Sequence, residues 1–208
     1  MPIAPEHLSA GLDALFAYIN TSDANPLIKT AIAHIEFEAL HPFKDGNGRI
    51  GRMLIPLLLW QMKKISAPHF YISHFFEENK DEYIERMRAV SAEGDWSGWC
   101  AFFCRAVSEQ ATQNLDIAEQ ITALYEAMKN RLTELLASKW TLTVLDALFT
   151  QPVFKASRFA DGHGIPKPTV PNLLKTLAEN HIITIIEEAA GRRSALYAFE
   201  PLLRLVRI

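Results

Sequence analysis

The chain of 208 residues contains only two cysteines and no long hydrophobic run. Cys100 and Cys104 lie four residues apart in a helical pattern, so they predict two buried free thiols and exclude a disulfide framework. The apolar run of residues 53–62 is far shorter than the ~20 residues that cross a bilayer, and the amino terminus has no export signal. We therefore expect a folded cytoplasmic protein that does not enter a membrane.

The chain also lacks a large excess of either charge, since its formal net charge is only −3. The charge is nevertheless uneven along the chain. Residues 1–137 have 12 Lys and Arg against 18 Asp and Glu, whereas residues 138–208 have 9 against 6. The first region is therefore acidic and the second mildly basic, which predicts two units with different roles.

Apolar residues recur at helical spacing through most of the chain, and strand-like alternation is nearly absent before residue 180. Trp96, Trp99, Phe102 and Phe103 follow this spacing, so we expect all four to anchor a core. The larger unit is therefore predicted to be all-α, with helices at residues 8–20, 26–41, 49–63, 77–90, 94–113 and 115–136.

The last 70 or so residues show a different order of elements. Helices are expected at residues 141–151, 155–164 and 168–181, and two strands at 183–188 and 194–200 form a hairpin with Gly191 at its turn. Three helices followed by a hairpin are typical of a winged helix-turn-helix. The predicted fold is mainly α, divided into a helical domain over residues 1–112, a linking helix over 113–137 and a winged-helix domain over 138–208.

The stretch HPFKDGNGRIGR, residues 41–52, combines glycines with charged residues. Gly46, Asn47 and Gly48 allow consecutive N–H groups to point into one concavity at the start of a helix, where phosphate binds well. Arg49 and Arg52 lie three residues apart on one helical face, so both can bind phosphate oxygens. This pattern predicts an anion site.

Two further residues of the stretch supply chemistry beside that site. Asp45 is a carboxylate at its mouth and suits Mg²⁺ that also contacts phosphates. Histidine is the side chain best suited to proton transfer near neutral pH, so His41 can accept a proton from an attacking hydroxyl. The combination indicates phosphoryl or nucleotidyl transfer. The same residues match the dinucleotide motif G-x-G-x-x-G, but a helix precedes them where that motif requires a strand.

The stretch resembles the Fic family signature H-[PF]-F-x-[DE]-G-N-G-R-x-x-R at every specified position. Residues 26–40 look like the helix that leads into the Fic loop, and residues 94–103 look like the closing helix of the family. The resemblance covers roughly residues 5–110, so the 1–112 domain is identified as a Fic-type helical bundle with catalytic function. The tail is similar to that of Fic proteins with an appended winged-helix module.

This resemblance implies a protein adenylyltransferase that moves AMP from ATP to a Ser, Thr or Tyr hydroxyl of a target protein. It implies that His41 is the general base and that Asp45 holds Mg²⁺. Phe43 is expected to anchor the loop in the core, and His34 to be a packing histidine. The nucleotide-binding residues that it implies are Gly46, Asn47, Gly48, Arg49, Ile50, Gly51, Arg52 and Tyr83.

The chain also departs from the family. No inhibitory [ST]-x-x-x-E-[GN] string occurs, and the nearest candidate, Glu179-Asn180, has Lys175 where Ser or Thr is required. The flap that docks target peptides would precede the chain, so we expect a fragment or a truncated product.

Several alternatives stay open. The loop could use another nucleotide, a phosphocholine donor or a γ-phosphate. The chain could instead be a DNA-binding regulator with a degenerate or nucleotide-sensing Fic unit, and its tail could contact a protein as well as DNA. A homodimer is a further option. The expected nucleic-acid contacts are Lys167, Lys175, Arg192 and Arg193.

Overall fold

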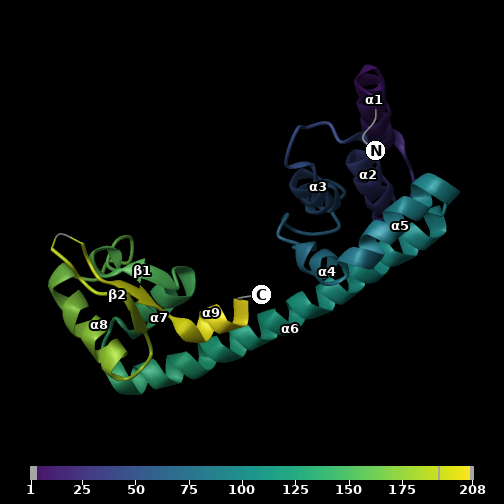
Figure 1. The fold of residues 1–208 in the computed structure, drawn as a ribbon. Coiled ribbons are helices and arrows are strands. Elements are labelled where there is room, and N and C mark those ends of the chain that lie inside the picture. Colours follow the sequence, from purple (N-terminus) through teal and green to yellow (C-terminus); the bar gives the residue numbers. More distant parts are fainter. Residues whose placement is uncertain (1–3, 192, 207–208) are drawn as a thin grey trace. The chain divides into compact units, whose positions relative to one another are not determined.

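The computed structural model describes residues 4–191 and 193–206 and divides the chain into two compact units, Met1–Gln113 and Asn114–Ile208 (Figure 1). The described part of the first unit is all-α, and the second unit adds a small sheet to its helices. The mainly α fold that the sequence predicts is thereby confirmed. None of the described helices is both long enough and apolar enough to span a bilayer.

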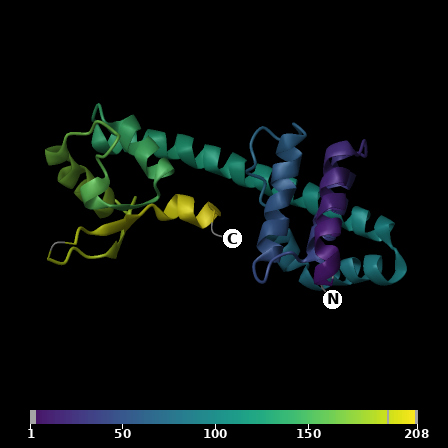
Figure 2. The same ribbon diagram turned by 90° about the horizontal axis from the view of Figure 1, so that it is seen from above.

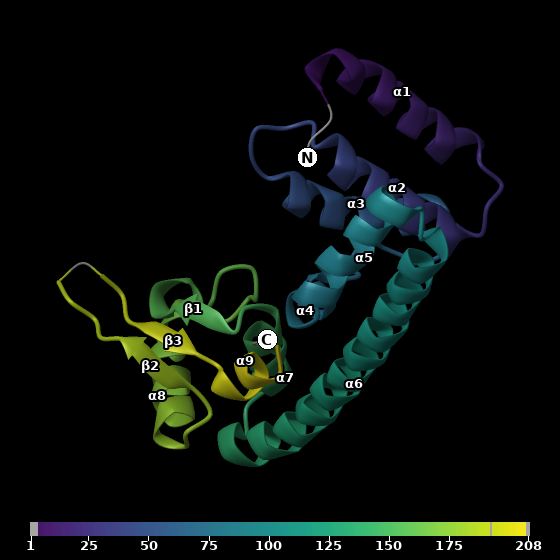
Figure 3. The ribbon, with the colours of Figure 1, turned by 45° about the vertical axis from the view of Figure 1, so that its right-hand side comes forward.

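Helix α2 is central to the first unit, since it packs against both α1 and α3 (Figures 2 and 3). Buried side chains from α2, α3 and the start of α6, among them Ala31, Ile55 and Trp99, form the larger of two hydrophobic clusters in this unit. The helices of this unit are α1 (Pro5–Thr21), α2 (Pro26–Leu40), α3 (Asn47–Gln61), α4 (Ser73–Glu78), α5 (Lys80–Glu93) and the first part of α6 (Trp96–Leu136).

Local sequence signals explain where α2 begins and ends. The Asn25 side chain accepts a hydrogen bond from the Leu27 N–H at 2.9 Å, and Pro26 occupies the first turn, where its missing N–H costs nothing. At the other end His41 takes a left-handed conformation, with φ of 48°. The loop that carries the family signature therefore starts at the point where α2 stops.

Helix α6 corrects the sequence prediction of two separate helices at residues 94–113 and 115–136. It is one helix over Trp96–Leu136. The physical reason is that neither glycine nor proline occurs between residues 99 and 136, so no local signal ends the helix.

Two expectations about side-chain burial in α6 are wrong. Trp99, Phe102 and Phe103 are buried as expected, but Trp96 is 38% exposed because it lies in the first turn of α6. The two cysteines are free, yet both are partly exposed. Periodicity therefore identified the core-facing side of the helix but not how deeply each residue is covered.

The second unit packs helices around a three-stranded antiparallel sheet of order β1-β3-β2 (Figure 3). Strand β3 lies in the middle, so that Tyr197 pairs with Phe154 of β1 and with Ile185 of β2. After the last part of α6, its elements are α7 (Thr141–Thr150), β1 (Val153–Lys155), the 3-10 turns η1 (Ala156–Arg158) and η2 (Lys167–Thr169), α8 (Val170–Glu179), β2 (Thr184–Glu187), β3 (Leu196–Ala198) and α9 (Glu200–Val206).

The prediction of a middle helix at residues 155–164 is wrong. That segment contains the end of β1, the short turn η1 and then non-helical chain. Gly162 and Gly164 take positive φ angles of 78° and 68°, which a helix does not accommodate. Strand β1 and helix α9 were not predicted, because both are short and owe their form to packing within this unit.

Candidate active site

The loop between α2 and α3 is defined by two left-handed residues. His41 ends α2, and Gly46, with φ of 84°, precedes the first residue of α3. The first helical hydrogen bond runs from the Ile50 N–H to the Gly46 carbonyl at 3.0 Å. The N–H groups of Asn47, Gly48 and Arg49 precede that bond and carry the positive end of the helix dipole, so this turn can bind an anion.

Asn47 holds the loop in shape with its side chain. The side chain is 2% exposed, accepts the Phe43 N–H at 2.9 Å and donates to the Phe43 carbonyl at 2.6 Å. Phe43 itself is 49% exposed, so the expectation that it anchors the loop in the core is wrong. Hydrogen bonds to the loop backbone, rather than burial of an aromatic ring, stabilise this turn.

Arg49 and Arg52 lie close to the glycines of the loop. A methyl group on Gly46 would stand 3.4 Å from Arg49 Nη2, and one on Gly48 would stand 3.6 Å from Arg52 Nη1. Two guanidinium groups therefore border the turn whose N–H groups can bind an anion. Their charge complements a phosphate chain.

Asp45 lies at the exposed edge of the same loop. Its Oδ2 is 3.4 Å from Arg49 Nη2, and both side chains are largely solvent-exposed. Such a pair contributes about 0–1 kcal/mol, so a ligand can separate it easily. Among the described residues no group of three or more His, Cys, Asp and Glu could hold a metal. One exposed carboxylate suits Mg²⁺ only when the ion shares its oxygens with substrate phosphates.

Arg52 borders two pockets of the first unit. One, of about 410 Å³, lies between α3 and residues 68–73, and Arg49 also lines it. The other, of about 380 Å³, lies against α4 and α5 and includes Tyr83, Phe76 and Lys80. The structure thus brings Arg49, Arg52 and Tyr83 to pockets, whereas Ile50 is exposed on α3 and Gly51 is buried within it.

Tyr83 is tied to the signature helix through His34. The buried His34 ring places Nδ1 3.0 Å from the Gly51 carbonyl and Nε2 3.0 Å from the Tyr83 hydroxyl. A carbonyl only accepts, so Nδ1 carries the proton and the Tyr83 hydroxyl donates to Nε2. The pKa of His34 is lowered to about 4, mainly because the ring is buried; the Gly51 hydrogen bond opposes this effect and the charge of Arg52 adds to it. His34 is thus a neutral packing residue, as the sequence indicates.

Glu38 is a residue of the site that sequence reasoning missed. Its carboxylate lies directly against Gly51, and burial raises its pKa while the nearby Arg52 and His41 oppose that rise. The signal available in the sequence was its position on α2, one helical turn before His41. Helical spacing alone could not show that the side chain faces the signature helix.

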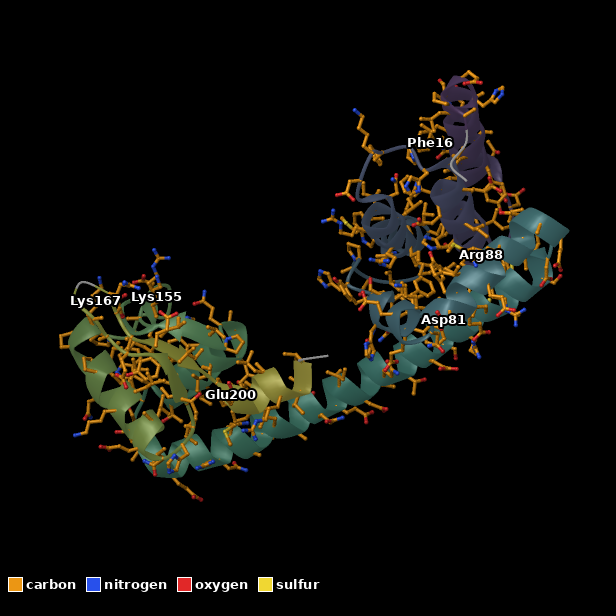
Figure 4. The ribbon with its side chains drawn as sticks, viewed as in Figure 1. Phe16, Asp81, Arg88, Lys155, Lys167 and Glu200 are labelled. Carbon is orange, nitrogen blue, oxygen red and sulfur yellow. The ribbon has the colours of Figure 1, made fainter. Side chains whose placement is uncertain are left out.

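The candidate nucleic-acid residues lie in the second unit, where Figure 4 labels Lys155 and Lys167. Lys167 and Lys175 line a groove of about 610 Å³ between α8 and the sheet, which is largely apolar. Lys175 Nζ also lies 3.8 Å from Glu179 Oε1. Arg193 exchanges backbone hydrogen bonds with Ala190 near the hairpin turn, and Arg192 lies outside the described residues.

Comparison with known proteins finds a family model and curated relatives that each match part of the chain. The family model described as "Fic/DOC family" matches residues 1–59. The "Protein adenylyltransferase fic-1" of Caenorhabditis elegans is 36% identical over 61 residues, which cover 28% of this chain and 12% of that protein. The "Protein adenylyltransferase Fic" of Aedes aegypti is 28% identical over 120 residues, or 56% of this chain and 22% of that protein.

A solved structure extends the likeness to the fold of the whole chain. The Fic family protein from Desulfovibrio desulfuricans G20 matches 96% of this chain and 57% of its own length, with a TM-score of 0.54 and 20% identity. The chain thus spans less than a third of the curated relatives and a little over half of the solved structure. Through residues 1–59, which contain the loop from His41 to Arg52, the chain is therefore similar to proteins of the Fic/DOC family.

Proposed function

We propose that the protein is a protein adenylyltransferase, which transfers AMP from ATP to a Ser, Thr or Tyr hydroxyl of a target protein and releases pyrophosphate. The observation that carries this proposal is the loop between α2 and α3, where His41, the first turn of α3 and two arginines lie together. The names of the curated relatives support the same reaction. We propose residues 1–112 as the catalytic domain.

The proposed roles follow from the chemistry of AMP transfer. The target hydroxyl oxygen forms a bond to the α-phosphorus, and its proton passes to the His41 imidazole. The bond from the α-phosphorus to the oxygen that bridges to the β-phosphate breaks, and pyrophosphate leaves. The N–H groups of Asn47, Gly48 and Arg49 and the guanidinium of Arg52 stabilise charge on the phosphates.

Asp45 is the residue that would hold Mg²⁺, together with oxygens of the nucleotide. The ion would neutralise phosphate charge. Arg49, which pairs with Asp45 in the structure, would then be released to bind phosphate oxygens. We place the nucleoside near Tyr83 because the pocket that Tyr83 lines also contains Arg52.

The transfer reaction can be tested with α-labelled ATP and Mg²⁺. We expect the wild-type protein to label itself or a protein of a cell lysate, and His41→Ala to lose that labelling by at least about 100-fold, since general base catalysis contributes about 10²–10⁴-fold. His7→Ala, which removes an exposed histidine of α1, should label like the wild type. Equal labelling by wild type and His41→Ala would contradict the proposal.

The loop binds the phosphates of the donor rather than its base. Another nucleotide, a phosphocholine donor or transfer of a γ-phosphate would use the same N–H groups and arginines. Labelling from α-labelled but not γ-labelled ATP would separate AMP transfer from phosphate transfer. A phosphocholine donor that carries its own label should not label the protein or the lysate.

The second unit supports a second candidate role, contact with DNA or with another protein, through a module that we propose to be a winged helix over residues 138–208. The order of α7, β1, α8 and the β2–β3 hairpin supports this proposal. Lys167, Lys175 and Arg193 are exposed in this unit and could contact phosphates. The apolar lining of the groove beside α8 favours a protein partner over DNA.

A further inference from the structure

Glu38 on α2 is a half-buried carboxylate that the roles proposed above do not use. It lies one helical turn before His41. Its Oε1 is shielded from solvent and has no hydrogen-bond partner among the residues that the structure describes. Most shielded polar atoms in proteins have a hydrogen-bond partner, so a carboxylate oxygen without one is unusual and indicates a role other than hydrogen bonding.

Gly51 allows this carboxylate to reach α3. A methyl group at position 51 would collide with Glu38 Oε1 and would stand 3.0 Å from Glu38 Cδ and 3.3 Å from Phe37 Cδ1. Arg52, the proposed phosphate clamp, follows Gly51 directly. The absence of a side chain at Gly51 therefore brings a negative charge from α2 up to the helix that begins at the anion-binding turn.

Three titratable groups face Glu38 from the elements around it: Arg52 on α3, His41 at the end of α2 and Tyr83 on α5. Burial raises the pKa of Glu38, and the charges of Arg52 and His41 oppose this rise. Burial also raises the pKa of Tyr83, and the charge of Glu38 raises it further, so Tyr83 remains a neutral phenol. Glu38 also lies only three positions before His41, which caps the carboxyl end of α2, so its carboxylate lies within one helical turn of the proposed general base.

We propose that Glu38 is a positioning residue that stabilises the positive charge which His41 acquires on taking the proton of the target hydroxyl. The proposal rests on the transfer reaction proposed above. This charge appears only as the hydroxyl attacks, so Glu38 stabilises the transition state more than the ground state. A carboxylate offers no attraction to a triphosphate, so we do not expect Glu38 to add to nucleotide affinity.

The test compares Glu38→Gln with Glu36→Gln, which removes the same charge from α2 beside a different pocket, lined by Tyr18 and Trp96. In Glu38→Gln we expect kcat to fall about 10- to 100-fold, as for the loss of one nearby charge, with the KM for ATP within roughly threefold of the wild type. The thermal midpoint should stay equal or rise, because an amide is easier to bury than a carboxylate. Glu36→Gln should leave kcat unchanged.

A purely structural role for Glu38 gives a different result. It would lower the thermal midpoint of Glu38→Gln and leave the kcat of the folded fraction intact, and that outcome would overturn the proposal. Glu38→Asp keeps the charge and should retain more activity than Glu38→Gln. If Glu38→Gln does not fold, Glu38→Met, which is similar in length and has no carboxylate, takes its place.

A measurement without substrate separates this proposal from the proposed reaction. If the carboxylate acts on His41, the ring resonances of His41, followed by NMR as a function of pH, should titrate at a lower pH in Glu38→Gln than in the wild type and in Glu36→Gln. An unchanged titration would overturn the coupling. A wild-type protein that labels no target, but whose His41 titration shifts in Glu38→Gln, would count against the transferase reaction alone.

Discussion

At the scale of single residues, the geometry of the candidate site depends on a side chain that makes no proposed contact with substrate. Asn47 is named in the family signature between two glycines, and its backbone N–H can contribute to the anion-binding turn. Its buried side chain, however, forms hydrogen bonds with both the N–H and the carbonyl of Phe43. One residue thus shapes the loop and supplies part of the site.

Asn47→Ala tests the structural part of that role. Removal of the side chain leaves the Phe43 N–H and carbonyl without their partner, so we expect the free energy of unfolding to fall by about 1–3 kcal/mol. Urea denaturation followed by tryptophan fluorescence measures this change. Asn20→Ala, at an exposed position of α1, should change stability by less than about 0.5 kcal/mol. If both variants unfold at the wild-type urea concentration, the Asn47 hydrogen bonds do not hold the loop.

At the scale of secondary-structure elements, three helices meet at one neutral imidazole. His34 of α2 donates to the Gly51 carbonyl of α3 and accepts from the Tyr83 hydroxyl of α5. Its ring also stacks near Phe76 and Trp99, with centroids 5.8 Å and 6.0 Å away. A proton on Nε2 would remove the acceptor that Tyr83 uses and would place a charge in this core.

The pH dependence of stability follows from that arrangement. The pKa of His34 is about 4 in the folded protein, against an ordinary value of 6.5, so the unfolded chain binds the proton more readily between these values. Stability from this group is therefore complete above about pH 6.5 and is lost as the pH falls towards 4. Between pH 7.5 and pH 5 the expected loss is about 2 kcal/mol.

Urea denaturation at pH 7.5 and pH 5.0 measures this loss in the wild type and in His34→Gln. The glutamine variant has no titrating ring, so the drop between the two pH values should be smaller by about 2 kcal/mol than in the wild type, although the variant is less stable at both. Other groups titrate in both proteins, and the comparison cancels them. Identical drops would show that His34 does not titrate differently on folding.

At the scale of the whole molecule, the two units have separate hydrophobic cores. The core of the second unit is formed by side chains such as Leu132 of α6, Leu145 and Leu148 of α7 and Leu177 of α8. The clusters of the first unit use residues of α2, α3 and the start of α6. Helix α6 contributes to both, but no buried side chain belongs to both sets among the described residues.

Leu148→Ala should therefore destabilise the second unit alone. Leu148 is fully buried, and replacing such a leucine with alanine costs about 2–5 kcal/mol. Hydrogen exchange followed by mass spectrometry should show faster exchange in peptides of α8 and unchanged exchange in peptides of α2. Leu142→Ala, at a 54% exposed position of the same helix α7, is the matched control and should leave both unchanged. Equal acceleration in both units would show that they unfold together.

The sequence by itself determined the helical class, the positions of α2 and α3 along the chain and the chemistry of the loop between them. These features depend on local signals: Asn25 and Pro26 at the start of α2, and Gly46 at the left-handed position before α3. Capping groups and left-handed glycines act over a few residues, so they can be recognised without knowledge of what packs nearby. The continuity of α6 was available in the same way, from the lack of glycine and proline after residue 98.

Only the tertiary structure decided which side chains are covered and which meet across helices. Phe43 and Trp96 looked like core residues and are exposed, whereas the polar Asn47 is buried. The contact of Glu38 with Gly51 joins residues 13 positions apart on two helices, and the bond from His34 to Tyr83 spans 49. Helical periodicity gives the direction of a side chain around its own axis but not the neighbour it meets. Burial and electrostatic coupling in this site therefore come from how α2, α3 and α5 pack together.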